Sequence, residues 1–116
     1  MENDDKKYNH QKLVRDKIPE LIISSGNECK TRIMDDDEFE IELKKKLLEE
    51  TKELIEASDE KVINEMADVL QVLISIAAQH NISLDKVIEY QIEKENKRGA
   101  FFQKIFLEWS TQPGGN

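Results

Sequence analysis

Two acidic clusters at helical spacing are the residues of this sequence that best fit a chemical role. Glu49-Glu50-Thr51-Lys52-Glu53 lies in one helical stretch, and Glu65-Met66-Ala67-Asp68 opens the next. Positions three or four residues apart share one face of a helix, so each cluster presents its carboxylates together. Carboxylate oxygens are the ligands that Mg²⁺ and Mn²⁺ prefer. The spacing indicates a divalent-cation site shared by two packed helices.

Counting angles at about 100° per residue places these carboxylates relative to the apolar stripe of each helix. Glu50 and Glu65 fall inside the stripes, Glu53 and Asp68 lie at the borders, and Glu49 points farther away. A buried carboxylate without a partner is costly, and a cation among them removes the conflict. The alternative is a pair of partly exposed acidic clusters balanced by nearby lysines. Those lysines are Lys44, Lys45, Lys46 and Lys61.

Composition limits the class of protein. The chain has 116 residues and a formal net charge of -8, which argues against nucleic-acid binding. Cys29 is the only cysteine, and no segment approaches the roughly 20 apolar residues that span a bilayer. We expect a cytoplasmic protein without a membrane segment. We expect a flexible tail over residues 1–9, one helical domain over 10–110, and a disordered tail over 111–116.

Apolar periodicity and capping residues predict an all-α fold, a helix bundle of about four to five helices. Gly26 and Gly99 are expected to stop the first and last helices, and Ser58 and Ser83 to cap the third and fourth at their N-termini. The aspartates at 35–37 suit the start of the second. Residues 29–34 are expected to be irregular or a small β segment. The expected helices span residues 20–25, 37–57, 59–79 and 84–97.

Two apolar segments predict self-association. The stretch from Val69 to Ala78 is too apolar for one partner helix to cover, so a second subunit is expected to bury it. An aromatic-rich segment follows Gly99 and is expected to pack on the bundle or on another subunit. Its apolar residues are Phe101, Phe102, Ile105, Phe106, Leu107 and Trp109.

The carboxylate pattern resembles a known family. Glu49-Glu50-x-x-Glu53 followed by Glu65-x-x-Asp68 is similar to the signature of the all-α nucleoside triphosphate pyrophosphohydrolases. That group includes MazG-like proteins, dimeric dUTPases and phosphoribosyl-ATP pyrophosphohydrolases. The segment from Lys12 to Pro19 resembles the N-terminal element of a small MazG-like subgroup, and Lys97-Arg98-Gly99-x-Phe101 resembles its C-terminal element. The resemblance runs from about Asn9 to Leu107, which is nearly the whole expected domain.

The resemblance implies Mg²⁺-dependent hydrolysis of the α–β phosphoanhydride of a nucleotide, with Mn²⁺ as a possible substitute, and a dimer or tetramer. It suggests removal of non-standard nucleotides. The implied metal ligands are Glu50, Glu53, Glu65 and Asp68. Glu49 matches the remaining motif carboxylate, and Glu49 and Glu50 are the candidates for catalysis. The basic residues expected to bind substrate phosphates are Arg15, Lys17, Lys46, Lys97 and Arg98.

Several alternatives stay open. The substrate is either a nucleoside triphosphate or phosphoribosyl-ATP, and a non-catalytic helical interaction module is the alternative from another class. Lys97 and Arg98 also suit the negative end of a helix dipole. Arg15 and Lys17 also suit surface ion pairs, with Asp16 and Glu20 as the partners.

Overall fold

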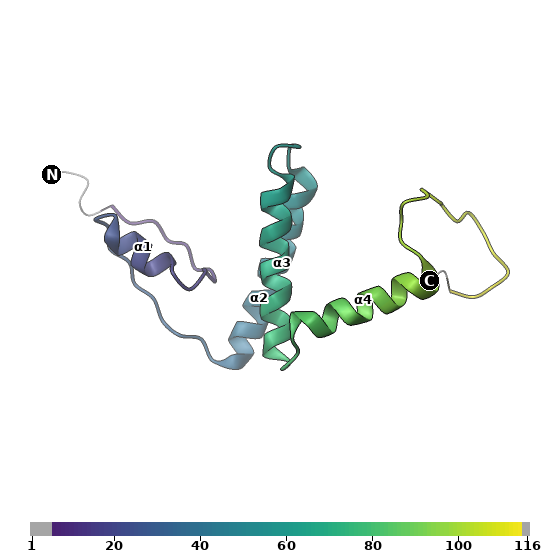
Figure 1. Cartoon of the computed structure of the whole chain (residues 1–116). Helices are drawn as coiled ribbons and strands as arrows, with labels where there is room; N and C mark the ends of the chain where they lie inside the picture. Colours follow the sequence, from purple (N-terminus) through teal and green to yellow (C-terminus); the bar gives the residue numbers. More distant parts are fainter. Residues whose placement is uncertain (1–5, 115–116) are drawn as a thin grey trace. The chain divides into compact units, whose positions relative to one another are not determined.

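The computed structural model describes residues 6–114, and this part of the chain forms four helices and no strand (Figure 1). The helices are α1 (Ile18–Ser24), α2 (Asp36–Glu56), α3 (Val62–Gln79) and α4 (Leu84–Arg98). The predicted all-α class is confirmed. The outermost residues of the two expected tails, 1–5 and 115–116, lie outside the described range.

The start of α2 follows from the aspartates that precede it. The Asp35 side chain accepts a hydrogen bond from the backbone N of Glu38 at 2.8 Å, which satisfies a donor that the helix itself leaves unpaired. Asp36 and Asp37 occupy the first turn, where negative charge is favourable. Residues 27–35 before it are irregular. Of the two structures expected for residues 29–34, irregular chain or a small β segment, the first is therefore found. The capping role predicted for this acidic run is correct.

The start of α3 differs from the prediction. Ser58 does not cap the helix: its carbonyl oxygen accepts a turn hydrogen bond from the backbone N of Lys61 at 2.9 Å. The helix begins at Val62 without a side-chain cap, three residues later than expected. It ends at Gln79 as predicted, and the positive φ of 60° at Asn81 turns the chain away.

Helices α2 and α3 pack against each other as an antiparallel pair (Figure 1). The Gln79 side chain donates a hydrogen bond to the carbonyl oxygen of Asp36 at 3.2 Å, which ties the end of α3 to the start of α2. The buried apolar residues of the described chain are Leu43, Val72 and Ala77, and Glu50 is buried among them. This helix pair is the scaffold that positions the acidic clusters.

The described residues fall into two compact units, one ending at Asn81 and the other beginning at Ile82. In the second unit the Ser83 side chain caps α4 by accepting a hydrogen bond from the backbone N of Lys86, and Gly99 ends the helix at a φ of +85°. Both were predicted. The aromatic-rich segment after Gly99 is exposed, so its burial on another subunit stays a prediction, as does the single domain over 10–110.

Length and composition alone would allow α3 to cross a membrane. One such helix is weak support for a membrane protein, because the central helix of a water-soluble protein passes the same test. Here α3 packs on α2 and carries Glu65 and Asp68 in its first half.

Candidate active site

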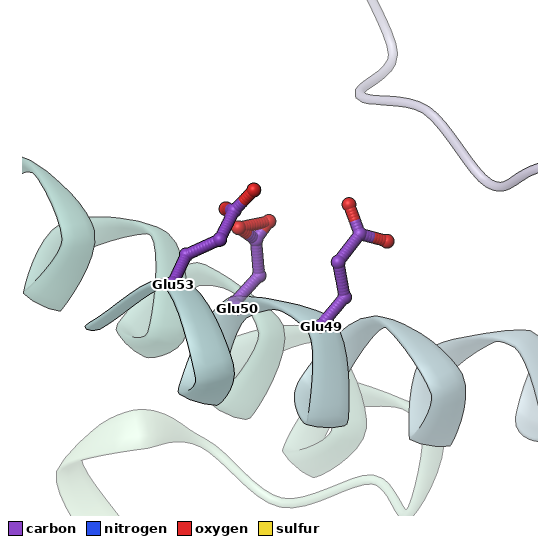
Figure 2. A group of neighbouring side chains, drawn as sticks. All are labelled: Glu49, Glu50 and Glu53. Carbon is purple, nitrogen blue, oxygen red and sulfur yellow. The ribbon is translucent and has the colours of Figure 1, made fainter. Parts of the chain in front are cut away.

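Three glutamates of α2 project from the same side of the helix. Glu49, Glu50 and Glu53 are labelled in Figure 2, where their carboxylates gather above one stretch of the ribbon. Each offers an oxygen, and these oxygens lie within 4.8 Å of one another. The arrangement follows in part from the helix, because Glu53 lies three residues after Glu50 and four after Glu49, and such positions are neighbours on one face.

Helix α3 brings two further carboxylates to the same place. Glu50, Glu65 and Asp68 also offer oxygens within 4.8 Å of one another. Glu50 belongs to both groups, so it connects the carboxylates of α2 with those of α3. Of the four residues predicted as metal ligands, Glu50, Glu65 and Asp68 therefore converge across the α2–α3 interface, and Glu53 joins them through its proximity to Glu50.

Burial sets the electrostatics of this cluster. Glu50 is only 8% exposed, and its pKa is raised from 4.5 to about 7, with burial as the largest cause. A hydrogen bond with Glu53 and the negative charges of Glu53 and Asp68 contribute to this rise, whereas the positive charge of Lys46 opposes it. The pKa of Glu50 is therefore near neutral because its negative form lacks enough positive charge around it.

Glu65 carries the clearest sign of an unmet interaction. Its Oε2 atom is buried and has no hydrogen-bond partner among the described residues. A buried oxygen acceptor without a partner is unfavourable unless a cation or a water completes its environment. With Glu50 and Asp68 beside it, this group of donors is made of carboxylate oxygens alone. That chemistry fits a hard divalent cation such as Mg²⁺.

Two basic side chains contact the carboxylate cluster directly. Arg15 Nη2 donates a hydrogen bond to Asp68 Oδ1 at 2.7 Å. Lys46 Nζ lies 3.5 Å from Glu49 Oε2, and its side chain is only 19% exposed. The alternative that paired Arg15 with Asp16 on the surface is wrong, because the partner is Asp68. A role for Arg15 or Lys46 toward a phosphate stays a prediction.

Other lysines near the cluster are engaged elsewhere. Lys44 pairs with Glu40 at 3.3 Å and Lys45 pairs with Glu42 at 3.1 Å. Lys61 makes no ion pair within residues 6–114. Of the lysines proposed to balance the acidic clusters as a solvated surface, only Lys46 contacts one of these carboxylates. The simple surface explanation is therefore weakened.

The remaining candidates for phosphate binding lie at helix ends. Lys17 is exposed at the N-cap position of α1. Lys97 and Arg98 occupy the last turn of α4, in the C-terminal unit, and Lys97 lies 3.6 Å from Glu93 on its own helix. That pairing agrees with stabilisation of the helix end. A role for these three residues toward substrate stays a prediction.

The Arg15–Asp68 contact is the feature that sequence reasoning missed. The two residues are 53 positions apart, and Arg15 lies before α1 in an irregular segment. Helical periodicity says nothing about contacts between an irregular segment and a helix. The resemblance of the segment around Arg15 marked it as a substrate-binding candidate but did not name its partner.

The geometry agrees with the comparison to known proteins. The sequence model of a family described as phosphoribosyl-ATP pyrophosphohydrolase matches residues 16–96, a range that includes the five carboxylates and Lys46. No curated protein and no solved structure matched the chain. Because the match covers well over half of its length, the chain belongs to the phosphoribosyl-ATP pyrophosphohydrolase family, within the MazG-like all-α superfamily, and is a nucleotide pyrophosphohydrolase that acts on acid anhydrides.

Proposed function

We propose that the protein uses Mg²⁺ to hydrolyse the α–β phosphoanhydride of a nucleoside triphosphate, which yields a monophosphate and pyrophosphate. The observation that carries the proposal is the convergence of Glu50, Glu65 and Asp68, with a buried Glu65 oxygen that has no partner among the described residues. Removal of non-standard nucleotides is the role we propose for this activity.

The carboxylates divide into two roles. Glu50, Glu53, Glu65 and Asp68 hold the cation, and Mn²⁺ is the expected substitute. A bound Mg²⁺ neutralises phosphate charge and lowers the pKa of an attacking water. Glu49 is more exposed than Glu50, and it faces the same side of α2 (Figure 2), so it is placed to orient that water and accept its proton.

Positive charge at both sides of the cluster suits the phosphates. Arg15 contacts Asp68 and Lys46 contacts Glu49, so the two cations flank the carboxylates. A guanidinium matches two phosphate oxygens at once, whereas an ammonium acts as a point charge. We assign Arg15 and Lys46 to the phosphates nearest the cation, and Lys17, Lys97 and Arg98 remain additional candidates.

Phosphoribosyl-ATP is the second candidate substrate, because the matching family carries its name. It contains the same α–β phosphoanhydride, so the chemistry of the site does not change. The match starts after Leu13, Val14 and Arg15 and stops before Lys97. Those flanking residues are the ones that resemble the small MazG-like subgroup, and on that ground we favour the nucleoside triphosphate.

A substrate panel tests the proposal. Pyrophosphate release is measured with standard and modified nucleoside triphosphates and with phosphoribosyl-ATP, with and without Mg²⁺. We expect activity that needs the metal and that falls at least about 100-fold in Glu50→Gln and in Asp68→Asn. Glu56→Gln, an exposed residue of the same helix, is the matched control and should retain activity. A chain inert toward the whole panel with Mg²⁺ or Mn²⁺ present would overturn the proposal and favour the non-catalytic module.

We also propose a cytoplasmic homo-oligomer. The family consists of soluble biosynthetic enzymes, which supports the location. The exposed apolar residues of α3 support self-association.

A further inference from the structure

Arg15 connects the segment before α1 to the carboxylate cluster. Its guanidinium donates a hydrogen bond to Asp68 Oδ1 at 2.7 Å. Within residues 6–114, no other side-chain hydrogen bond or ion pair joins the segment before α1 to the α2–α3 pair. Asp68 is one of the oxygen donors grouped with Glu50 and Glu65. A positive side chain therefore contacts a carboxylate that a cation would need.

The ion pair between Arg15 and Asp68 can be broken readily, so that either side chain can take another partner. The Arg15 side chain is 56% exposed and that of Asp68 is 28% exposed, so water screens the pair and competes for both partners. A single N–H group of Arg15 is engaged in this contact, and the guanidinium keeps further donors in a planar fork. A divalent cation interacts more strongly with a carboxylate oxygen than one exposed guanidinium donor does, because of its higher charge density.

The backbone at Arg15 is held while its side chain is exposed. The Arg15 carbonyl oxygen accepts a hydrogen bond from the backbone N of Ile18 at 3.1 Å, and Leu13 and Val14 are partly buried. The backbone at Arg15 is thus tied to the start of α1, so a change of partner needs only rotation of the exposed side chain.

We propose that Arg15 is an exchangeable counter-ion of the cation site: it pairs with Asp68 while that carboxylate is free of metal, and it transfers to a phosphate of the nucleotide once the cation takes Asp68. The inference rests on the proposed function, because it needs a cation at the carboxylates. Arg15 then acts as a positioning residue for the phosphate in the metal-loaded protein and as a competitor for Mg²⁺ in the metal-free one.

The exchange predicts effects of opposite sign when Arg15 is removed. Mg²⁺ should bind more tightly, because its competitor for Asp68 is gone and the local positive charge is lower. The nucleotide should bind more weakly, because a phosphate contact is lost. A fixed structural brace would behave differently: its removal would loosen the cluster and weaken the binding of both.

The test measures Mg²⁺ binding alone by titration calorimetry, and separately KM and kcat for the best nucleoside triphosphate. In Arg15→Ala we expect the Kd for Mg²⁺ to fall about two- to fivefold, the range of an exposed ion pair, and KM to rise about tenfold. Arg15→Lys keeps the charge without the fork, so its Kd for Mg²⁺ should stay near the wild-type value while KM rises.

The matched control is Arg32→Ala. Arg32 is also an exposed arginine, and it donates two hydrogen bonds of 2.7 Å to Glu38 at the start of α2, so it forms an ion pair outside the cluster. Its removal should leave the Kd for Mg²⁺ and KM unchanged. Circular dichroism of each variant checks that helix content is retained. If Arg15→Ala does not fold, Arg15→Gln, which removes the charge and keeps most of the side chain, replaces it with the same expected changes in Kd for Mg²⁺ and in KM.

The outcomes separate the two proposals. If wild-type protein binds Mg²⁺ but Arg15→Ala binds it equally or more weakly, the exchange is wrong and the cation site stands. If KM rises in Arg15→Ala with no tightening of Mg²⁺ binding, Arg15 contacts substrate without competing, and the exchange is again wrong. If wild-type protein binds no Mg²⁺, both the exchange and the proposed function fail.

Discussion

At the scale of single residues, Glu50 is the centre of the site. It belongs to both carboxylate groups, it is buried, and its pKa is raised to about 7. Without a cation, its negative form is therefore unfavourable in the folded protein. The same property makes it a strong ligand once positive charge is supplied, because the repulsion from Glu53 and Asp68 is then removed.

The first prediction concerns the pH dependence of stability without metal. Because the pKa of Glu50 is higher in the folded protein than its ordinary value of 4.5, the folded state binds more protons between pH 4.5 and about 7. The free energy of unfolding should therefore fall as pH rises through this range, by roughly 2–3 kcal/mol. Urea unfolding in the presence of EDTA, repeated at several pH values, measures the slope.

Glu50→Gln supplies the comparison for this measurement. The amide is neutral at every pH and can still donate a hydrogen bond to Glu53, so the slope between pH 4.5 and 7 should become much smaller. An equally steep fall in Glu50→Gln would show that another group produces it.

The sequence predicted which carboxylates converge but not what surrounds them. Angle counting placed Glu50 and Glu65 inside apolar stripes, because a regular helix fixes the direction of each side chain. The contact of Arg15 with Asp68 depends on the path of an irregular segment, and no local spacing encodes that path. Regular elements could be predicted, and a contact made by an irregular segment could not.

At the scale of elements, capping decides where the helices begin. The Asp35 side chain accepts a hydrogen bond from the backbone N of Glu38 at 2.8 Å, and Ser83 makes the equivalent bond to Lys86. The start of α3 at Val62 has no such side-chain cap. Of the two paired helices, α2 therefore has the more firmly fixed N-terminus. The carboxylates Glu49, Glu50 and Glu53 lie farther along this helix.

The second prediction tests that cap. Asp35→Ala removes the acceptor for the Glu38 N–H group, so it should lower the free energy of unfolding by about 1 kcal/mol. Asp37→Ala is the control, since Asp37 lies in the first turn and contributes only through its charge; its effect should be a few tenths of a kcal/mol. Chemical unfolding followed by circular dichroism measures both. Equal losses in the two variants would mean that charge, and not the cap, stabilises the start of α2.

Ser58, which does not cap α3, shows why helix boundaries are hard to predict. Ser58 and Ser83 are both followed three residues later by a lysine. Ser83 directly precedes the apolar Leu84, whereas two acidic residues follow Ser58 and the first apolar side chain is Val62. A helix gains packing energy only from its apolar positions, so α3 begins where they begin, and Ser58 is left in the turn.

At the scale of the whole molecule, the pair formed by α2 and α3 leaves many large apolar side chains exposed to solvent. The exposed large apolar side chains of α3 recur at intervals of three and four residues: Ile63, Met66, Leu70 and Leu73. Those of α2 recur every seven residues: Ile41, Leu48 and Ile55. Such intervals are those of apolar seams between helices, so each helix presents a face suited to a further helix. The predicted excess of apolar residues in α3 is thus visible as exposed surface.

The last prediction is that a second subunit covers these faces. Burial of apolar side chains is the main favourable term in association, so wild-type protein should sediment as a dimer or tetramer at micromolar concentration. In Leu70→Glu a charge enters the seam, and dissociation to monomers is expected. Gln71→Glu adds the same charge at the adjacent exposed polar position, so it should leave the assembly intact. A wild-type protein that stays monomeric in sedimentation velocity, or a Leu70→Glu variant that keeps the wild-type mass, would contradict the prediction.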